Sequence, residues 1–151
     1  MNTQLDQTYL NAWRLFITSH ARLIARIDQD LAAAGQIPLN WYDVLIELAE
    51  APKHRLRMSE LADKVVLSKS GLTRLVDRLE KEGFLRRKRT SEDKRGAYAV
   101  LTDQGWEAMR QAWPVYASGI QSYFAHYLNV DEAHLLTEAF SQMLEGLREA
   151  E

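Results

Sequence analysis

Apolar residues recur at every third or fourth position along most of the chain, which is the spacing of an amphipathic helix. The predicted helices cover residues 4–34, 39–50, 59–64, 69–82, 103–127 and 131–148. Pro114 lies inside the fifth of these runs. We expect it to kink or break that helix, because proline lacks the backbone N–H that an inner turn needs. The pattern therefore describes a chain that is mainly helical.

Between the fourth and fifth helices the apolar period changes to one typical of strands. Residues 85–90 and 97–101 are strand-like, and the polar stretch between them predicts a β-hairpin with a long tip. Gly83 stands where the end of a helix favours left-handed backbone geometry. The expected N-cap residues of the helices are Ser59, Ser68 and Thr102. The predicted order is two helices, a short and a longer helix, a hairpin and two more helices.

The composition is that of one globular domain of 151 residues, with 46% hydrophobic and 26% charged residues. The chain has 0 Cys, which excludes disulfides, thiolate metal sites and cysteine-based redox sensing. The N-terminus lacks the pattern of a secretory signal, and no apolar run approaches the ~18 residues of a membrane span. We therefore expect a soluble, cytoplasmic protein without a membrane partner.

The charges are distributed unevenly. The chain has a net charge of −2, yet residues 53–96 contain 14 Lys and Arg against 7 Asp and Glu. A basic segment within an acidic chain is typical of a surface that binds a polyanion, although a solvated face with no partner has the same composition. A membrane surface would instead require the basic residues on an amphipathic helix or beside a membrane span.

The short and longer helices, joined by a tight turn, have the pattern of a helix-turn-helix, whose second helix enters the DNA major groove. Leu72, Leu75, Val76 and Leu79 form its apolar stripe. The polar positions of that helix are Lys69, Ser70, Thr73, Arg74, Arg78 and Lys81. The helix N-terminus suits phosphate oxygens, and Arg74 is placed to reach a guanine edge. There are alternatives to these DNA contacts. Arg74 and Arg78 could pair with Asp77 or Glu82 on a solvated face, and Ser68 and Ser70 could serve as helix caps.

The hairpin carries six basic residues, which a DNA-gripping wing would use on the phosphate backbone. They are Arg86, Arg87, Lys88, Arg89, Lys94 and Arg95. At the tip, Asp93 and Arg95 are two residues apart and can share one side of the turn. Asp93 would then orient Arg95 for a narrow, A·T-rich minor groove. The alternative is a surface ion pair that contributes ~0–1 kcal/mol.

Four motifs follow one another along the chain, Met-Ser-Glu-Leu-Ala (58–62), Gly-Leu-Thr-Arg-Leu-Val-Asp-Arg-Leu-Glu-Lys-Glu-Gly (71–83), Asp-Lys-Arg-Gly (93–96) and Leu-Thr-Asp-Gln-Gly (101–105). In their order and spacing they resemble the MarR family of winged helix-turn-helix transcription regulators. The resemblance implies a mainly α fold of one MarR-type domain, residues 1–151. Its DNA-binding lobe with a β-hairpin wing would span 39–102, and dimerisation helices would span 4–34 and 103–150.

By the same resemblance, the protein is a homodimer that binds double-stranded DNA at a pseudo-palindromic operator. The predicted DNA-binding residues are Ser68, Lys69, Ser70, Thr73, Arg74, Arg78, Arg89, Asp93, Lys94 and Arg95. Family members commonly act as repressors and release DNA when a small, often aromatic or phenolic, anionic molecule binds. The candidate effector-binding residues are Trp13, Arg14, His20, Trp41 and Tyr42. The aromatic residues among them also suit core or dimer packing, and His20 also suits a buried structural position.

Other functions have less support in the sequence. The four histidines lack the spacing of a metal site, so we expect neither a bound metal nor a cofactor. No glycine-rich phosphate loop, nucleophile elbow or triad-like group indicates an enzyme. Two alternatives stay open from the residues alone, namely a DNA-binding regulator without a small-molecule effector and a transcriptional activator.

Overall fold

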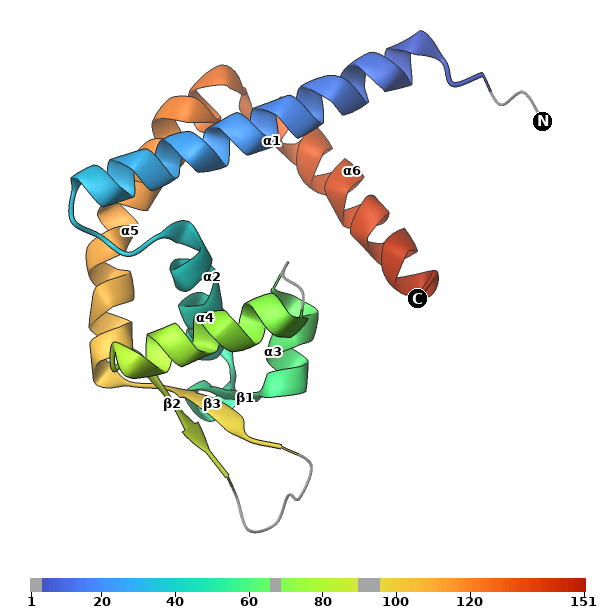
Figure 1. The fold of residues 1–151 in the computed structure, drawn as a ribbon. Helices are drawn as coiled ribbons and strands as arrows, with labels where there is room; N and C mark the ends of the chain where they lie inside the picture. The colour runs from blue at the N-terminus through green and yellow to red at the C-terminus, as the bar shows by residue number, and fades with distance from the viewer. Residues whose placement is uncertain (1–3, 66–68, 90–95) are drawn as a thin grey trace. The chain divides into compact units, whose positions relative to one another are not determined.

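The computed structural model describes residues 4–65, 69–89 and 96–151, without the side chain of Lys69. Figure 1 shows the six helices and three strands of this described part. The helices are α1 (Gln7–Ala33), α2 (Leu39–Glu50), α3 (Met58–Lys64), α4 (Lys69–Lys81), α5 (Asp103–Tyr123) and α6 (Val130–Glu149). The strands are β1 (Arg55–Arg57), β2 (Leu85–Lys88) and β3 (Tyr98–Leu101). The mainly helical fold that the sequence predicts is confirmed.

The chain divides into two compact units. We call Ile24–Tyr116 the winged-helix unit, and we call Met1–Leu23 together with Ala117–Glu151 the terminal-helix unit. The boundaries fall inside α1 and α5, so each of these helices contributes to both units.

The core of the winged-helix unit is built from apolar side chains of its helices and of its sheet. Helix α2 is its most deeply buried helix, with Val44, Leu45 and Leu48 fully buried. The predicted apolar stripe of α4 is buried as well. Each such side chain contributes about 1.5–3 kcal/mol through removal from water. The core therefore fixes which face of α4 is exposed.

The three strands form an antiparallel sheet in the order β1–β3–β2. Its β2–β3 pair confirms the predicted hairpin, with Leu85 opposite Leu101 and Lys88 opposite Tyr98. Strand β1 was not predicted, because three residues are too few to establish a two-residue period. The predicted hairpin tip lies outside the described residues.

Two predicted helix ends are confirmed in detail. Gly83 has φ +81°, and the N–H of Phe84 donates to the carbonyl of Leu79 across the end of α4. At the start of α5, the N–H of Gly105 donates to Oγ1 of Thr102 over 3.1 Å. A side chain on Gly105 would overlap the carbonyl oxygen of Phe84, so this approach requires glycine.

One prediction about a helix end is wrong, and one predicted helix break does not occur. Helix α3 begins at Met58, so Arg57 and not Ser59 is its N-cap residue, and the carboxylate of Glu60 accepts the N–H of Arg57 over 3.0 Å. Helix α5 continues through Pro114 to Tyr123, so the predicted break is absent, and the alternative of a kink stays a prediction. A proline removes one backbone donor, and the rest of the helix tolerates that loss here.

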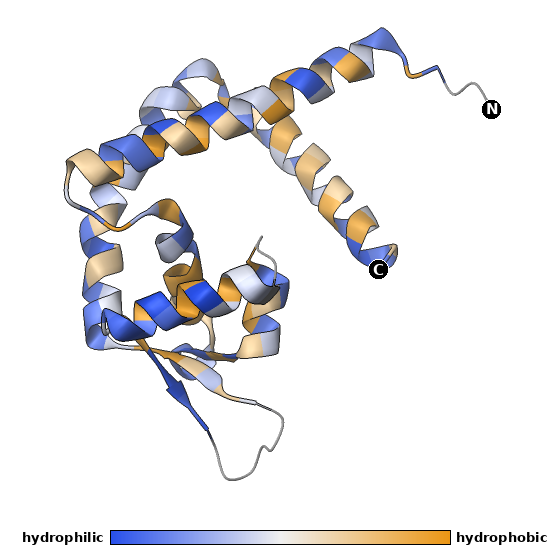
Figure 2. Ribbon diagram, viewed as in Figure 1, coloured by the Kyte–Doolittle hydropathy of each residue, from blue (hydrophilic) through white to orange (hydrophobic). Residues whose placement is uncertain are grey.

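The terminal-helix unit has almost no apolar core of its own. None of the hydrophobic side chains that are buried in the described chain belongs to it. Phe16 of α1 lies 5.4 Å from Phe140 of α6, measured between ring centroids. Hydrophobic positions nevertheless recur along both helices (Figure 2), and side chains such as Leu144 are largely exposed. No helix in the described part of the chain is long and apolar enough to cross a membrane.

Candidate nucleic-acid interface

Helix α4 separates its two faces cleanly. Leu72, Leu75, Val76 and Leu79 are at most 5% exposed. The opposite face is exposed and carries Ser70, Thr73, Arg74 and Arg78. Because the apolar stripe anchors the helix in the core, these polar side chains point into solvent together. Ser68 and the side chain of Lys69, also predicted to bind DNA, lie outside the described part.

Arg74 and Arg78 do not form ion pairs with Asp77 or Glu82. The alternative interpretation, in which these arginines only pair with acidic neighbours on a solvated helix face, required such pairs. Asp77 pairs instead with Arg87 of β2, with 2.6 Å between Nη2 and Oδ1. Within the described residues, neither Arg74 nor Arg78 has an ion pair. Both guanidinium groups are therefore available to an external acceptor.

Arg87 joins the hairpin to α4 and is not an outward-facing wing residue. Its N–H donates to Oε2 of Glu80 over 2.7 Å, and its Nη1 donates to Oε1 of the same carboxylate over 3.2 Å. The side chain is only 27% exposed, while Arg86, Lys88 and Arg89 are exposed. Arg87 thus fixes β2 relative to α4, and its neighbours carry the positive surface.

We predict that Glu80→Ala destabilises the protein by about 1 kcal/mol, because it removes two hydrogen bonds to Arg87. Equilibrium unfolding in urea measures the change. Glu82→Ala is the matched control, since Glu82 is exposed and makes no such bond within the described residues. Equal stability of the two variants would show that this contact does not hold β2.

Strand β1 adds two arginines that the sequence analysis missed. The guanidinium carbon of Arg55 lies 4.6 Å from the centre of the Tyr98 ring, and that of Arg57 lies 5.6 Å from it. The Arg57 Nε also donates to the Tyr98 hydroxyl over 3.2 Å. Tyr98 begins β3 opposite Lys88, so these contacts add positive charge at the end of the strand pair that leads into the hairpin tip. The alternating sequence Arg-Leu-Arg was the available signal.

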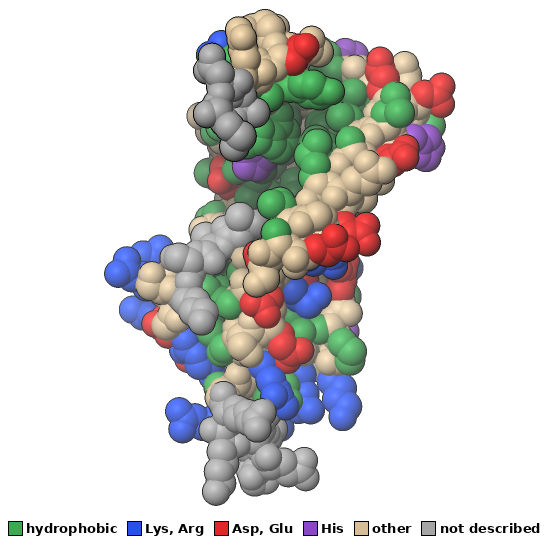
Figure 3. All heavy atoms as spheres, turned by 90° about the vertical axis from the view of Figure 1, so that its right-hand side faces the viewer, with side chains coloured by type: hydrophobic (Ala, Val, Ile, Leu, Met, Phe, Trp, Pro, Cys, Tyr) green, Lys and Arg blue, Asp and Glu red, His purple; other side chains and the backbone are tan. Residues whose placement is uncertain are grey.

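Basic side chains gather on the winged-helix unit, as the space-filling view shows (Figure 3). Exposed members of this surface are Arg74, Arg78, Lys81, Arg86, Lys88 and Arg89. They come from α4 and from the hairpin, which follow one another in the chain. Asp93, Lys94 and Arg95 of the predicted wing tip lie outside the described residues. The described surface suits contacts with phosphate oxygens.

The predicted effector residues divide between the two units. Trp13, Arg14 and His20 lie on α1 in the terminal-helix unit, where Trp13 and His20 flank Phe16 with ring centroids 6.1 and 6.4 Å from its own. Trp41 and Tyr42 lie on α2 in the winged-helix unit. The side chains on α1 are exposed.

Trp41 and Tyr42 point to different neighbours. Trp41 packs edge-on against Phe84, with ring centroids 6.0 Å apart. This contact agrees with the alternative interpretation, in which Trp41 is a packing residue. Tyr42 stacks on Trp113 of α5 at 6.4 Å and meets Tyr116 edge-on at 5.1 Å. Tyr42 is thus the predicted effector residue around which a cluster of rings forms.

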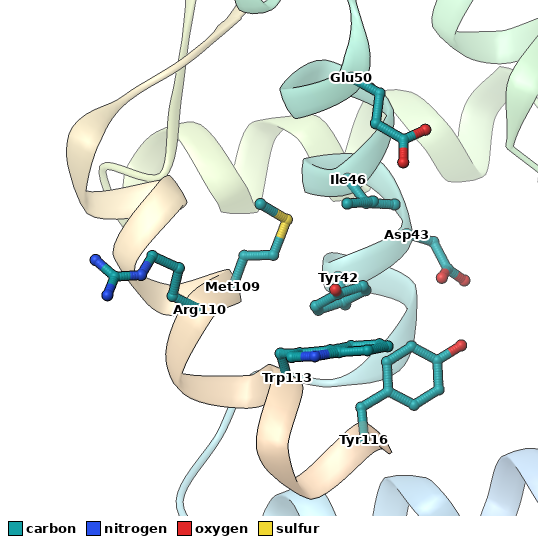
Figure 4. A pocket seen from close by; sticks show the side chains of 8 residues that line it. All are labelled: Tyr42, Asp43, Ile46, Glu50, Met109, Arg110, Trp113 and Tyr116. Carbon is teal, nitrogen blue, oxygen red and sulfur yellow. The ribbon is translucent and has the colours of Figure 1, made fainter. Parts of the chain in front are cut away.

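This ring cluster lines a cavity of about 650 Å³ between α2 and α5, which we call the aromatic cavity (Figure 4). Its lining residues are Tyr42, Asp43, Ile46, Glu50, Met109, Arg110, Trp113 and Tyr116. The volume is in the range of small-molecule sites, which combine apolar walls with a few polar groups. The sequence pattern places Trp113 and Tyr116 only on the apolar face of a helix and does not predict their role here.

The protein environment alters three ionisable groups of the aromatic cavity. Burial, and then the nearby charges of Asp28 and Glu47, raise the pKa of Asp43 above its usual value. Burial also raises the pKa of the Tyr42 hydroxyl, with further contributions from Tyr116, Asp43 and Glu50. The pKa of the Tyr116 hydroxyl rises through burial and the charge of Asp43. Both hydroxyls therefore keep their protons at neutral pH.

Known proteins similar to this chain are transcriptional regulators. A family model described as MarR family matches residues 36–96. The regulator AbsC of Streptomyces coelicolor is 32% identical, with a TM-score of 0.88 over 98% of this chain and 99% of that one. Sco3205 of the same organism, solved in complex with DNA, is 33% identical, with a TM-score of 0.89 over 97% of this chain and 92% of that one.

A relative found by sequence is the HTH-type transcriptional regulator PrsX of Escherichia coli. It is 32% identical over 116 residues, which are 75% of this chain and 69% of that protein. The match thus extends beyond the helix-turn-helix into the flanking helices. Together with the exposed polar face of α4, these similarities settle the family. The chain belongs to the MarR family of DNA-binding transcriptional regulators.

Proposed function

We propose that this protein is a cytoplasmic repressor that binds a pseudo-palindromic operator as a homodimer and releases it when a small aromatic molecule binds. The observation that carries the DNA-binding part is the exposed polar face of α4, whose arginines have no ion pair within the described residues. The solved complex of Sco3205 with DNA supports it, since that protein shares a third of its sequence with this chain.

The proposed contacts follow from the position of each residue. Ser68, Lys69 and Ser70 stand at or near the start of α4, where backbone N–H groups and the helix dipole favour phosphate. Thr73 and Arg74, one turn further on, would face the base edges of the major groove. Arg78 and Arg89 would contact the backbone. The tip residues Asp93, Lys94 and Arg95 would reach the minor groove.

The terminal-helix unit supports the homodimer. Large apolar side chains are exposed along α1 and α6, and none of the described hydrophobic side chains of this unit is buried. Exposed apolar area of this extent marks an interaction surface. A second copy of the chain presents the same surface, so a twofold contact would cover both. The terminal-helix unit would therefore need the dimer to bury its apolar side chains.

The aromatic cavity supports a small-molecule effector. It has an appropriate volume, and its walls combine three rings with two tyrosine hydroxyls and two carboxylates. Helix α5, which forms one wall, also runs into the terminal-helix unit. A ligand that shifts α5 against α2 would therefore alter the spacing of the two α4 helices in a dimer. If the ligand binds the state with shifted α5 more tightly than the DNA-bound state, its binding would release the DNA.

A selection from genomic DNA fragments tests the proposed function. The full-length protein should retain fragments that share one inverted repeat, with half-sites about 10 base pairs apart, one helical turn. Protection from nuclease should cover both half-sites. Recovery of fragments without any common sequence, or protection of one isolated half-site, would contradict specific binding by a symmetric dimer.

A further inference from the structure

The charged groups of the aromatic cavity do not balance one another. Arg110 is the cation among the lining residues, but its Nη1 lies 3.3 Å from the carboxylate of Glu107. Figure 4 shows its guanidinium group turned away from Tyr42 and Trp113. Neither the Asp43 nor the Glu50 carboxylate has a hydrogen bond or an ion pair within the described residues. The cavity thus has two carboxylates that no cation of the described chain neutralises.

The aromatic rings add to this negative character. The face of an aromatic ring is the negative part of its quadrupole and attracts cations within about 6 Å. Tyr42, Trp113 and Tyr116 lie within 5.1–6.4 Å of one another, and the edge-on orientation of Tyr116 presents rings in two directions. Trp113, the strongest cation-binding ring type, is 49% exposed and so keeps a surface for a ligand.

Both carboxylates belong to exposed residues of α2 that line the aromatic cavity together with the rings. In Figure 4 the carboxylates of Asp43 and Glu50 and the hydroxyl of Tyr116 lie on the same side of the Tyr42–Trp113 pair. The charge of Asp43 also acts on both tyrosine hydroxyls, where it raises the pKa. A bound cation would stabilise the ionised form of Asp43 and so oppose the upward shift of its pKa.

We propose that the aromatic cavity binds an organic cation, an ammonium group attached to an aromatic ring system, and discriminates against anions. The rings would stack on the ligand's ring, and Asp43 and Glu50 would neutralise its ammonium group. A carboxylate ligand would instead meet two like charges. This inference rests on the proposed function, because it specifies the charge of the small molecule that would release the DNA. It reverses the anionic ligand that the family resemblance implies.

Three molecules with one ring system and different charges test the inference. Calorimetric titration of the 151-residue protein would compare tryptamine, a cation, with indole, which is neutral, and indole-3-acetate, an anion. We expect tryptamine to bind at least about tenfold more tightly than indole, and indole-3-acetate to bind more weakly than indole. Equal or tighter binding of indole-3-acetate would overturn the proposal, and so would the absence of binding by all three.

Substitutions then assign the preference to the cavity. The isosteric double variant Asp43→Asn, Glu50→Gln should lose at least about tenfold in tryptamine affinity and keep its indole affinity within about twofold. Trp113→Leu should weaken both. Asp63→Asn removes an exposed carboxylate of α3 outside the cavity and should change neither. Tryptamine affinity unchanged in the double variant, with thermal unfolding like that of the wild type, would contradict the proposal.

DNA release separates this inference from the proposed function. If tryptamine binds in the cavity but the operator complex persists, the cation site stands and the release mechanism fails. If indole-3-acetate both binds more tightly and releases DNA, the release mechanism stands and the cation preference is wrong. Measuring ligand affinity and operator release on the same protein therefore gives each proposal its own outcome.

Discussion

Leu144→Glu should convert the proposed dimer into monomers. Leu144 lies on α6, and its side chain is 62% exposed in the single chain. Removing a leucine from an apolar interface costs about 1.5–3 kcal/mol, and a buried unpaired carboxylate adds to that cost. We therefore expect the dimer dissociation constant to rise by at least about 100-fold. Sedimentation velocity at micromolar concentration measures it directly.

A matched control is available two residues earlier. Gln142→Glu adds the same charge to α6 at an exposed polar position and should leave the dimer intact. The Leu144 variant should also show reduced helix content by circular dichroism, because the terminal-helix unit lacks a described buried core. A stable wild-type monomer of 17.4 kDa, or a Leu144→Glu dimer as tight as the wild type, would contradict the proposed interface.

Arg74→Ala should reduce the preference for operator over other DNA by ~1–3 kcal/mol, the range for an arginine that reads a guanine edge. The reason is the position of Arg74 on the exposed face of α4, without an ion pair in the described residues. Competition between the operator and single-base variants of it, at fixed salt, measures the preference at each position. The loss should be confined to the base pairs that Arg74 contacts.

Two other arginines provide the comparison for Arg74. Arg86→Ala removes an exposed cation of β2 and should weaken binding equally across sequences while lowering its salt dependence. Arg148→Ala, near the end of α6, should change neither quantity. If Arg74→Ala weakens all sequences equally, Arg74 is a backbone contact, and base recognition must come from other residues of α4.

The sequence predicted those parts of the fold that a repeated pattern specifies. The apolar stripe of α4 repeats over about two turns, and Leu72, Leu75, Val76 and Leu79 are buried as expected. Gly83 was predictable because a helix end has a specific backbone geometry. Strand β1 was missed because its three residues acquire their conformation from pairing with β3, a contact between residues about 40 positions apart.

The aromatic cavity was harder to predict because it depends on the contact between two helices. Trp113 and Tyr116 fit the apolar face of α5, and no local pattern distinguishes a cavity wall from a core residue. Asp43 and Glu50 are seven residues apart and so share a face of α2, but acidic residues are common on exposed helix faces. Arg87 likewise resembled its basic neighbours until its contacts with Asp77 and Glu80 were seen.

The most direct measurement is the affinity of the full-length protein for its selected operator and for a scrambled duplex of equal composition, at two salt concentrations. A fluorescent label on each duplex gives both affinities under identical conditions. Specific recognition with backbone contacts predicts a preference of about 10³-fold or more and weaker binding at the higher salt concentration. Equal affinity for the two duplexes at both salt concentrations would contradict a sequence-specific regulator.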